Sequence, residues 1–545
     1  MTDDQRTEVA ARVLINGTIL TMDAANTIAE AVIVRDGRIA AVGSNEAIQQ
    51  QLRGDETVTD LQGKTVLPGF IDAHGHFPGS GLTAVGIDLN SPPIGRMTSI
   101  PQVLEGLREK AAATEKGRWV YGFGFDDTLL AEKRMLTRQD LDSVSTDHPI
   151  CVSHISGHLG SVNTAGLKAA GIGSDTPDPE GGVICREDQT GRPSGVLEEN
   201  AHSPVRTQAM QFTPENILQM VQTAVSDYTR HGVTTAQSGL CDQQLIDGLS
   251  MASQAALVPM RLMTWPDPVL SEKIIAGEYE TASHNNDLFQ IGAAKIIGDG
   301  SIQGFTANLS KPYHTPYKGD AGYCGYPVTD RKTMTDLVRK FHEAGMQIAI
   351  HGNGDATIDD IIYAISEAQR RHPRSDTRHM IIHCQTVRDD QLDEMARLGI
   401  TPSFFPVHAY YWGDRHRSIF LGPERADRMN PAGSALKRGI PFTIHLDTPV
   451  TPMRPLLAVW AAVNRLSTGG AIIGADERIT PLQALRATTI DAAWQIFQEE
   501  NRGSLEPGKF GDLVILADNP LERPESIRDI EVLETIVGGR TVYQK

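Results

Sequence analysis

The length, composition and charge of the chain exclude several classes of protein. Of its 545 residues, 40% are hydrophobic and 22% are charged, as in folded globular proteins and unlike disordered chains. The formal net charge of −18 repels phosphate groups, so we expect neither nucleic acid nor a membrane as a partner. The five cysteines form no CxxC pair, and the sequence shows neither a signal-peptide pattern nor an apolar run of roughly 18 residues. We therefore expect a cytoplasmic protein.

Both ends of the chain have the pattern of short β-strands. From Ala11 to about Thr65, apolar and polar residues alternate between Gly and Asp-Gly turns. The stretch from about Gly503 to the last residue has the same pattern. We predict one small β domain built from both termini, with the central region inserted between them.

The central region repeats a short apolar strand followed by a helical segment, which is typical of parallel α/β architecture. The candidate strands are Val66 to His74, Gly232 to Ser238, Pro259 to Trp265, Gln290 to Ile297, Met346 to Gly352, His379 to Gln385, Ile400 to Pro406 and Pro441 to Asp447. Eight strands are the number of a TIM barrel. A long stretch after the first strand, about 77–230, has helices and a Gly-rich hairpin pattern. We predict that it caps the end of the barrel where substrates bind.

Residue types that bind metal ions stand at or near the C-terminal ends of several candidate strands. They are His74, His76, Lys295, His351, His383 and Asp447. A barrel brings such strand ends together at one mouth. On a strand, His74 and His76 point to the same side, so both can bind one cation. The whole set, more than any single motif, predicts a metal centre.

Each of these residues also has a simpler interpretation. A single histidine after an apolar strand, such as His351 or His383, is more often a hydrogen-bonded core residue. Asp447 is also placed to cap a helix. Lys295, in a buried strand, is either paired with Asp299 or shifted toward the neutral amine. A neutral amine can react with carbon dioxide, and the resulting carbamate can bridge two metal ions about 3.5 to 4 Å apart.

A series of segments in a fixed order resembles the amidohydrolase superfamily, in particular amidohydrolase family 3, the N-substituted formamide deformylase-like group. The segments include VLPGFIDAHGH, GHLGSVNTAGLKAAGI, KIIGDGSIQGFTANL, IAIHGNGDATID, MIIHCQTV, HLDTPV and GSLEPGKFGDLVILADNP. They cover nearly the whole chain. The resemblance implies a distorted TIM (β/α)8 barrel of residues 68–499, capped by about 77–230. It also implies a small β-sandwich formed by residues 1–67 and 500–545.

The resemblance also implies a centre of one or two divalent ions, with Zn²⁺ as the expected metal. It places His74, His76 and Asp447 on one ion and His351 and His383 on a second. Lys295, carboxylated on its amine, would bridge the two. The implied reaction is hydrolysis of a non-peptide carbon–nitrogen bond, amide or formamide-like, in a small molecule by metal-activated hydroxide. Asp447 would be the catalytic acid and base, and a homodimer would be in keeping with such enzymes.

Two positions depart from the family pattern. His445 stands two residues before Asp447, where relatives usually read Gly, and we expect it to support the ligands or to contact substrate. Ile382 precedes His383, where Glu is common, so any role of that acid is absent here.

The other candidates for substrate contact are aromatic or polar side chains on the rim. They are His158 and Tyr121 in the predicted cap and His408 and Trp412 after the seventh strand, with Phe125, Tyr410 and Tyr411 in the same clusters. Aromatic residues on loops more often serve packing than recognition.

Other functions remain open at this point. A deaminase with one metal ion, an esterase or a lactonase would use the same hydroxide, although a single metal needs no bridging Lys295. A non-catalytic ligand-binding barrel would be expected to lack some of the ligands, whereas every expected position is filled here.

Overall fold

The computed structural model describes residues 11–545, and its central strands run in parallel. One sheet has the order β17–β16–β15–β8 and a second has the order β18–β19–β20–β21–β22. The strands are β8 Phe70–Ile71, β15 Val233–Cys241, β16 Arg261–Pro266, β17 Phe289–Ile291, β18 Ala294–Ile297, β19 Ile348–Gly352, β20 Met380–His383, β21 Thr401–Phe404 and β22 Thr443–Ile444. All pairs within these two sheets are parallel. The central region therefore has a TIM-barrel-like α/β fold.

Helices connect these strands, as the alternation in the sequence predicts. They are α6 Pro214–Arg230, α7 Gln243–Gln254, α8 Pro268–Ala276, α9 Arg331–Glu343, α10 Asp355–Arg371, α11 Asp389–Leu398, α12 Val407–Arg415, α13 Pro423–Arg428, α14 Ala432–Lys437, α15 Pro455–Asn464, α16 Pro481–Ala487 and α17 Ile490–Gln495. Apolar side chains of most of these helices and strands share the largest buried core of the described residues. Within residues 11–545, no helix is long and apolar enough to cross a membrane.

Two of the predicted strands are broken, so their predicted limits were wrong. Val66 to His74 divides after Pro68, and Gly69 lies so close to Thr234 that a Cβ there would be 2.1 Å from its side chain. Gln290 to Ile297 divides at Gly292, where a Cβ would lie 2.7 Å from Met263 Sδ. In both places glycine lets the backbone pass close to a neighbouring strand.

Strands from both ends of the chain meet in one sheet, in the order β25–β24–β23–β7–β2–β3. The strands are β2 Thr18–Leu20, β3 Ile28–Ala29, β7 Thr65–Pro68, β23 Leu513–Leu516, β24 Val532–Val537 and β25 Arg540–Gln544. A second sheet, β5–β4–β1–β6, contains β1 Arg12–Ile15, β4 Ala31–Arg35, β5 Arg38–Gly43 and β6 Thr57–Asp60, with α1 Asn45–Gln49 beside it. Side chains of both sheets share one apolar core. The first ten residues of the predicted terminal domain lie outside the described residues.

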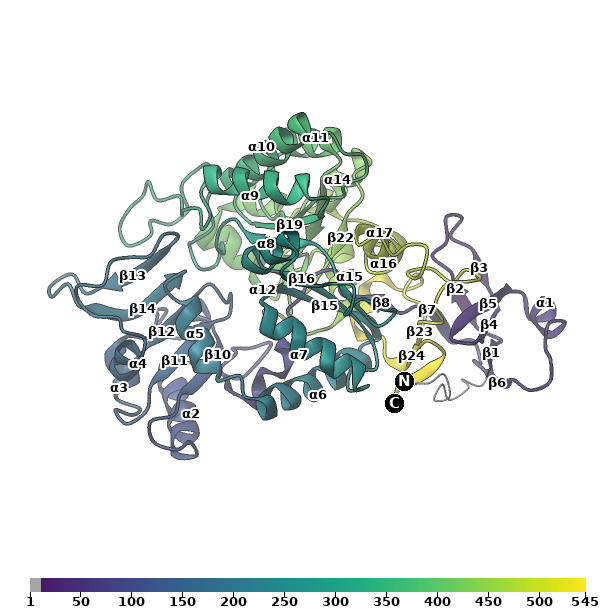
Figure 1. The fold of residues 1–545 in the computed structure, drawn as a ribbon, viewed down its shortest axis with the longest axis horizontal. Coiled ribbons are helices and arrows are strands. Elements are labelled where there is room, and N and C mark those ends of the chain that lie inside the picture. Colours follow the sequence, from purple (N-terminus) through teal and green to yellow (C-terminus); the bar gives the residue numbers. More distant parts are fainter. Residues whose placement is uncertain (1–10) are drawn as a thin grey trace.

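The segment between β8 and β15 forms a third unit, which lies on the opposite side of the central strands from the N-terminal strands (Figure 1). Its sheet has the order β13–β14–β12–β11–β10–β9. The strands are β9 Ile87–Asp88, β10 Val120–Phe125, β11 Ile150–His154, β12 Leu159–Val162, β13 Gly182–Arg186 and β14 Pro193–Glu199, and the helices are α2 Ile100–Ala112, α3 Arg138–Asp142, α4 Thr164–Ala169 and α5 Ser203–Met210. The antiparallel pair β13–β14 confirms the predicted Gly-rich hairpin. We call the unit formed by these strands and helices, residues 87–210, the cap.

Candidate metal centre

Four histidines and one aspartate converge at the C-terminal ends of the central strands. The ring centroids of His74 and His76 are 5.1 Å apart, those of His74 and His383 are 5.6 Å apart, and those of His351 and His383 are 4.6 Å apart. Asp447 Oδ1 lies 3.2 Å from His76 Nε2 and 3.5 Å from His74 Nε2. Asp447 Oδ2 lies 3.9 Å from His383 Nε2. The structure therefore brings together the residues that the sequence placed at separate strand ends.

His74 and His76 do not lie on a strand, contrary to the sequence expectation. Strand β8 ends at Ile71, and both histidines belong to the loop that follows it. This loop is held on β15, because Gly75 N–H donates to Gln237 Oε1 (2.8 Å) and Gly239 N–H donates to Gly75 O (2.8 Å). The two rings reach one place through this loop geometry and not through strand periodicity.

The loops after the first and last central strands lie against each other. Asp447 N–H donates to His74 O (3.2 Å), and His76 N–H donates to Thr448 O (2.8 Å). Asp447 has a positive φ of 53° in a turn and begins no helix, so the helix-cap alternative is wrong. These backbone bonds hold the carboxylate beside the two histidines.

Three of the histidines have their Nδ1 atoms on oxygen acceptors. His76 Nδ1 donates to Gly239 O (2.9 Å). His351 Nδ1 donates to Asp299 Oδ1 (3.2 Å), and three backbone N–H groups favour the ionised form of this carboxyl although burial raises its pKa to about 7. His74 Nδ1 donates to Gln237 Oε1 (3.2 Å), which already accepts a backbone N–H. A neutral ring held in this way carries its hydrogen on Nδ1 and its lone pair on Nε2, the atom free to bind a metal.

The pKa values of these groups match that role. Burial lowers the pKa of His74, His351 and His383 well below the usual value for histidine, so the rings are neutral. Burial alone raises the pKa of Asp447, but His76 and other neighbours outweigh it and bring that pKa to about 2. Neutral imidazoles and an ionised carboxylate are the forms that bind metal ions.

Lys295, the second residue of β18, is completely buried beside this cluster. Among residues 11–545 its Nζ has no hydrogen-bond partner, and burial lowers its pKa to about 7. The alternative of an ion pair with Asp299 is wrong, because Asp299 instead accepts hydrogen bonds from His351 and from backbone N–H groups, including that of Gly354 (2.7 Å). The chain thus contains a buried amine that is easily neutral.

The ligand set fits a divalent cation. Asp447 Oδ1 lies 3.2 Å from His76 Nε2 and 3.5 Å from His74 Nε2, and within residues 11–545 no hydrogen bond of normal geometry reaches it. Electron pairs that face one another repel unless a proton or a cation lies among them. The ligand atoms of His74, His76 and Asp447 all lie within 4.8 Å of one another, close enough for one ion.

A second group of metal-binding residue types lies in the cap, but its buried carboxylate, Asp126, is already paired with a cation. Asp126, Asp127 and His154 have ligand atoms within 4.8 Å of one another. However, Asp126 Oδ2 accepts hydrogen bonds from Arg415 (2.7 Å) and from Trp412 Nε1 (3.1 Å). The Arg415 guanidinium thus forms an ion pair with the Asp126 carboxylate. This ion pair joins the cap to α12.

His158 is the cap residue that the structure brings to the cluster. Its ring centroid lies 5.0 Å from that of His351, and its Nδ1 donates to Glu199 Oε2 (2.7 Å). Burial alone lowers the pKa of His158, but the Glu199 carboxylate outweighs burial and raises it above the usual value. Nε2 of His158 is left for a ligand.

The other expected substrate contacts lie further back. Tyr121 is buried in the cap, where its hydroxyl donates to Ser153 (3.2 Å). Phe125 is likewise buried in the cap. His408 packs on Phe405 with a centroid distance of 4.5 Å. Trp412 donates a hydrogen bond to Asp126 and packs against Tyr411. Tyr410 packs against Trp460. The structure does not place these side chains against the candidate ligands, and their contact with substrate stays a prediction.

Sequence reasoning missed which residues support the ligands, and it considered Asp299 only as a partner of Lys295. Gln237 lies near the end of β15, Asp299 follows β18, and Glu199 ends β14 of the cap. No local pattern marks them, although a buried polar residue near a strand end is a usable signal. His445, expected either behind the ligands or against substrate, contacts His383 at 3.0 Å.

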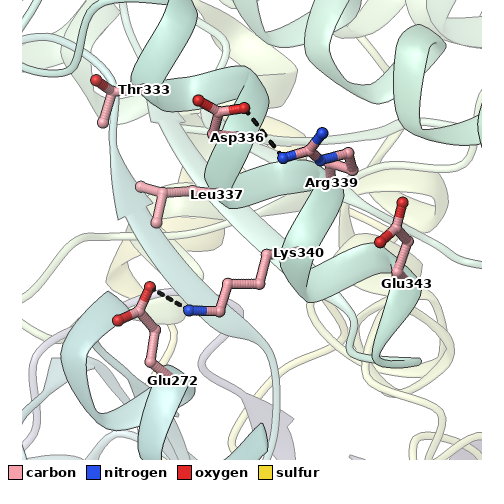
Figure 2. A pocket seen from close by; sticks show the side chains of 7 residues that line it. All are labelled: Glu272, Thr333, Asp336, Leu337, Arg339, Lys340 and Glu343. Atoms are coloured by element: carbon pink, nitrogen blue, oxygen red, sulfur yellow. Dashed lines mark hydrogen bonds and ion pairs between the residues drawn. The ribbon is translucent and has the colours of Figure 1, made fainter.

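A surface groove of about 510 Å³ lies elsewhere, between α8 and α9 (Figure 2). Charged side chains line most of it, and two of them, Lys340 and Glu272, form an ion pair of 2.7 Å. None of the seven residues that line it belongs to the candidate centre. The groove is therefore separate from the chemistry proposed below.

The parallel strands define a TIM-barrel-like α/β protein, and the convergent residues at their ends define a candidate metal site. The model of the amidohydrolase family matches residues 57–543, and the chain belongs to this family, whose members are metal-dependent. An N-substituted formamide deformylase of Arthrobacter pascens is 30% identical over 551 residues, which cover 99% of both chains.

Solved structures show the same fold. An uncharacterized metal-dependent hydrolase from Pyrococcus horikoshii matches with a TM-score of 0.75 at 24% identity, over 95% of this chain and 99% of the other. An adenosine deaminase from Xanthomonas campestris with bound zinc matches with a TM-score of 0.54 at 12% identity, over 98% of this chain and 92% of the other. At these identities the likeness concerns the fold alone.

Proposed function

We propose that the chain hydrolyses a non-peptide carbon–nitrogen bond, amide or formamide-like, in a small molecule. The observation that carries the proposal is the convergence of four histidines and the Asp447 carboxylate around one place, with the buried amine of Lys295 beside them. The relative named as an N-substituted formamide deformylase supports this type of bond.

The chain would hold two divalent ions, with Zn²⁺ as the proposed metal. His74, His76 and Asp447 would bind one ion, and His351 and His383 the other. Lys295, whose pKa of about 7 favours the neutral amine, would react with carbon dioxide and bridge them as a carbamate. When bound, the metal supplies the positive charge that acidifies water and polarises a carbonyl.

Asp447 would move the proton. Its carboxylate, with a pKa of about 2, accepts a proton from the attacking water and delivers it to the leaving nitrogen, which is otherwise too basic to depart. The backbone bonds of Asp447 to the His74 loop hold it in position during this transfer. A carboxylate that carries out both steps must contact water and substrate in turn.

His158 would orient the substrate. Glu199 holds the ring through Nδ1, so Nε2 can hydrogen-bond to the polar group of a substrate that enters between the cap and the central strands. His408, Trp412, Tyr121 and His445 remain proposed contributors to the walls of the substrate site.

The architecture proposed with this function is a closed, distorted (β/α)8 barrel of residues 68–499 with the cap at about 77–230, beside a β-sandwich of residues 1–67 and 500–545. The backbone bond between Asp447 and His74 supports closure, because it joins the loops after the first and last strands. We further propose a cytoplasmic enzyme that acts as a homodimer.

The test is hydrolysis of a panel of amides, formamides, esters and cyclic ureas by the purified protein, after metal removal and after addition of Zn²⁺. We expect metal-dependent release of amine from an amide or formamide and about two zinc ions per chain. Preference for an ester or a lactone, or release of ammonia from a ring amino group with one zinc per chain, would replace the proposal by the corresponding alternative. No turnover of any compound by the zinc-loaded protein would favour a ligand-binding role.

A further inference from the structure

His383 differs from the other three histidines in the hydrogen-bond partner of its Nδ1 atom, which is a histidine and not an oxygen. Its Nδ1 contacts His445 Nε2 at 3.0 Å, and a neutral imidazole nitrogen can either donate or accept. This contact alone leaves two arrangements. Either His383 carries its hydrogen on Nδ1 and offers Nε2 to a metal, or it carries the hydrogen on Nε2 and cannot bind there.

A chain of hydrogen bonds continues from His445 into the protein. His445 Nδ1 contacts Ser403 Oγ (2.9 Å), Ser403 Oγ contacts Thr443 Oγ1 (2.8 Å), and Thr443 Oγ1 contacts Gln495 Oε1 (2.8 Å). Each of these four residues is at most 2% exposed. From His383 of β20, the chain thus passes through His445, which follows β22, to β21, then to β22 and to the last residue of α17, shielded from water.

The far end of this chain has a fixed direction. Gln495 Nε2 donates to Thr401 Oγ1 (2.9 Å) and to Pro402 O (3.5 Å). A backbone carbonyl only accepts, so the amide nitrogen must face that side and Oε1 must face Thr443. Gln495 Oε1 has no hydrogen to give, which makes Thr443 the donor of this bond.

The donor of each remaining hydrogen bond then follows from the one before it, because each hydroxyl group has a single hydrogen. Thr443 donates its only hydroxyl hydrogen to Gln495, so Ser403 must donate to Thr443. The Ser403 hydroxyl then has no further hydrogen to donate, so His445 must donate to Ser403 from Nδ1. His445 has no carboxylate partner in these bonds, so a buried charged ring there would be unpaired. The neutral ring has no hydrogen on Nε2, and the bond to His383 must come from His383 Nδ1.

We propose that Gln495 sets the tautomer of His383 through Thr443, Ser403 and His445, and so leaves the Nε2 lone pair of His383 for a metal ion. The part that concerns the metal rests on the proposed function. The four residues act through His383 and are positioning residues.

The test is the affinity for Zn²⁺, measured by competition with a chromophoric chelator. Thr443→Val keeps the shape of the side chain but frees the Ser403 hydroxyl to donate to His445 Nδ1, which permits the wrong tautomer of His383. We expect about 10- to 100-fold weaker binding of the ion at this position. Ser403→Ala, which removes the middle link, should weaken it similarly, and Thr443→Ser, which keeps the hydroxyl, should bind as the unmodified chain does.

Thr535→Val is a matched control. Thr535 is also completely buried in a strand, but its hydroxyl donates to Thr229 O in another part of the molecule. It should leave zinc affinity unchanged. Folded Thr443→Val and Ser403→Ala variants that bind zinc as tightly as the unmodified chain would overturn the inference.

Nitrogen-15 NMR of metal-free protein labelled at histidine separates this inference from the proposed function. His383, assigned by comparison with a His383→Gln variant, should carry its hydrogen on Nδ1, and Thr443→Val should move a fraction of it to Nε2. This result can hold in a protein that hydrolyses no amide. Conversely, an active amidase whose His383 carries its hydrogen on Nε2 would retain the proposed function and overturn the relay.

Discussion

The two parallel sheets hold their candidate ligands in different ways. Behind His74 and His76, beside β8 and β15, the supporting acceptors are one step away and are a side-chain amide and a backbone carbonyl. In the other sheet, His351 relies on the Asp299 carboxylate and His383 on a chain of four side chains. One half of the centre is thus supported in a single step from β15. In the other half, the support of His383 passes through four side chains, so that half should be more sensitive to remote substitutions.

The largest effect is expected where the two halves meet. Asp447 contacts histidines from both sheets, and Asp447→Asn keeps its shape but removes the proton acceptor. We expect kcat to fall by about 10²- to 10⁴-fold, with a smaller change in KM, in steady-state assays on the best substrate of the panel. A variant with a raised KM and an unchanged kcat would contradict the proton-transfer role.

Lys295 tests whether the second sheet supplies a bridge. Lys295→Met retains an apolar side chain of similar length, and we expect zinc per chain, measured by elemental analysis, to fall from two to one, with loss of most activity. Because the pKa of Lys295 is about 7, the neutral amine that reacts with carbon dioxide predominates at pH 8 and is scarce at pH 6. Bicarbonate should therefore raise zinc loading of the unmodified chain at pH 8 and have little effect at pH 6. Equal loading of Lys295→Met and the unmodified chain at pH 8 would exclude the bridge.

Gln237 tests the one-step support in the first sheet. Gln237→Leu removes the acceptor of His74 Nδ1 and of Gly75 N–H, so we expect about 10- to 100-fold weaker zinc binding at that site. Gln237→Glu keeps an oxygen for both bonds and serves as the control, with a smaller loss. If both variants bind zinc as the unmodified chain does, the backbone alone orients His74.

The smallest effect on the centre is expected from the contact between the cap and α12. Asp126→Asn leaves Arg415 without its anionic partner and should lower stability by about 3 kcal/mol, seen as a lower Tm, with zinc content unchanged. Burial alone raises the pKa of Asp126, but Arg415 and His154 outweigh it and lower that pKa below its usual value. The ion pair therefore stabilises the fold fully above the usual pKa of aspartate, and this stabilisation is lost as the pH falls through the folded value. The Tm difference should accordingly narrow in acid, and a constant difference across pH would argue against an electrostatic origin.

The structure also shows why parts of the sequence analysis failed. Val66 to His74 has the composition of one strand, but Gly69 lets the chain leave the terminal sheet and pass close to β15 before β8 begins. The i and i+2 spacing of His74 and His76 gave the correct pair for an incorrect reason, since a loop brings the rings together. Lys295 and Asp299 are near in sequence, yet the nearby backbone N–H groups bind Asp299 more directly than the amine does.

The sequence alone determined the α/β character, the β-rich ends and the identity of the converging histidines and aspartate. The strands and helices follow from hydrophobic periodicity, which is a local property of the chain. The convergence of the ligands follows from the general rule that the C-terminal ends of parallel barrel strands meet at one face. Only the tertiary structure decided which group stands behind each ligand. Gln237, Asp299 and Gln495 are identified by the hydrogens and lone pairs that they share with distant residues, and this pairing exists only once the strands are assembled.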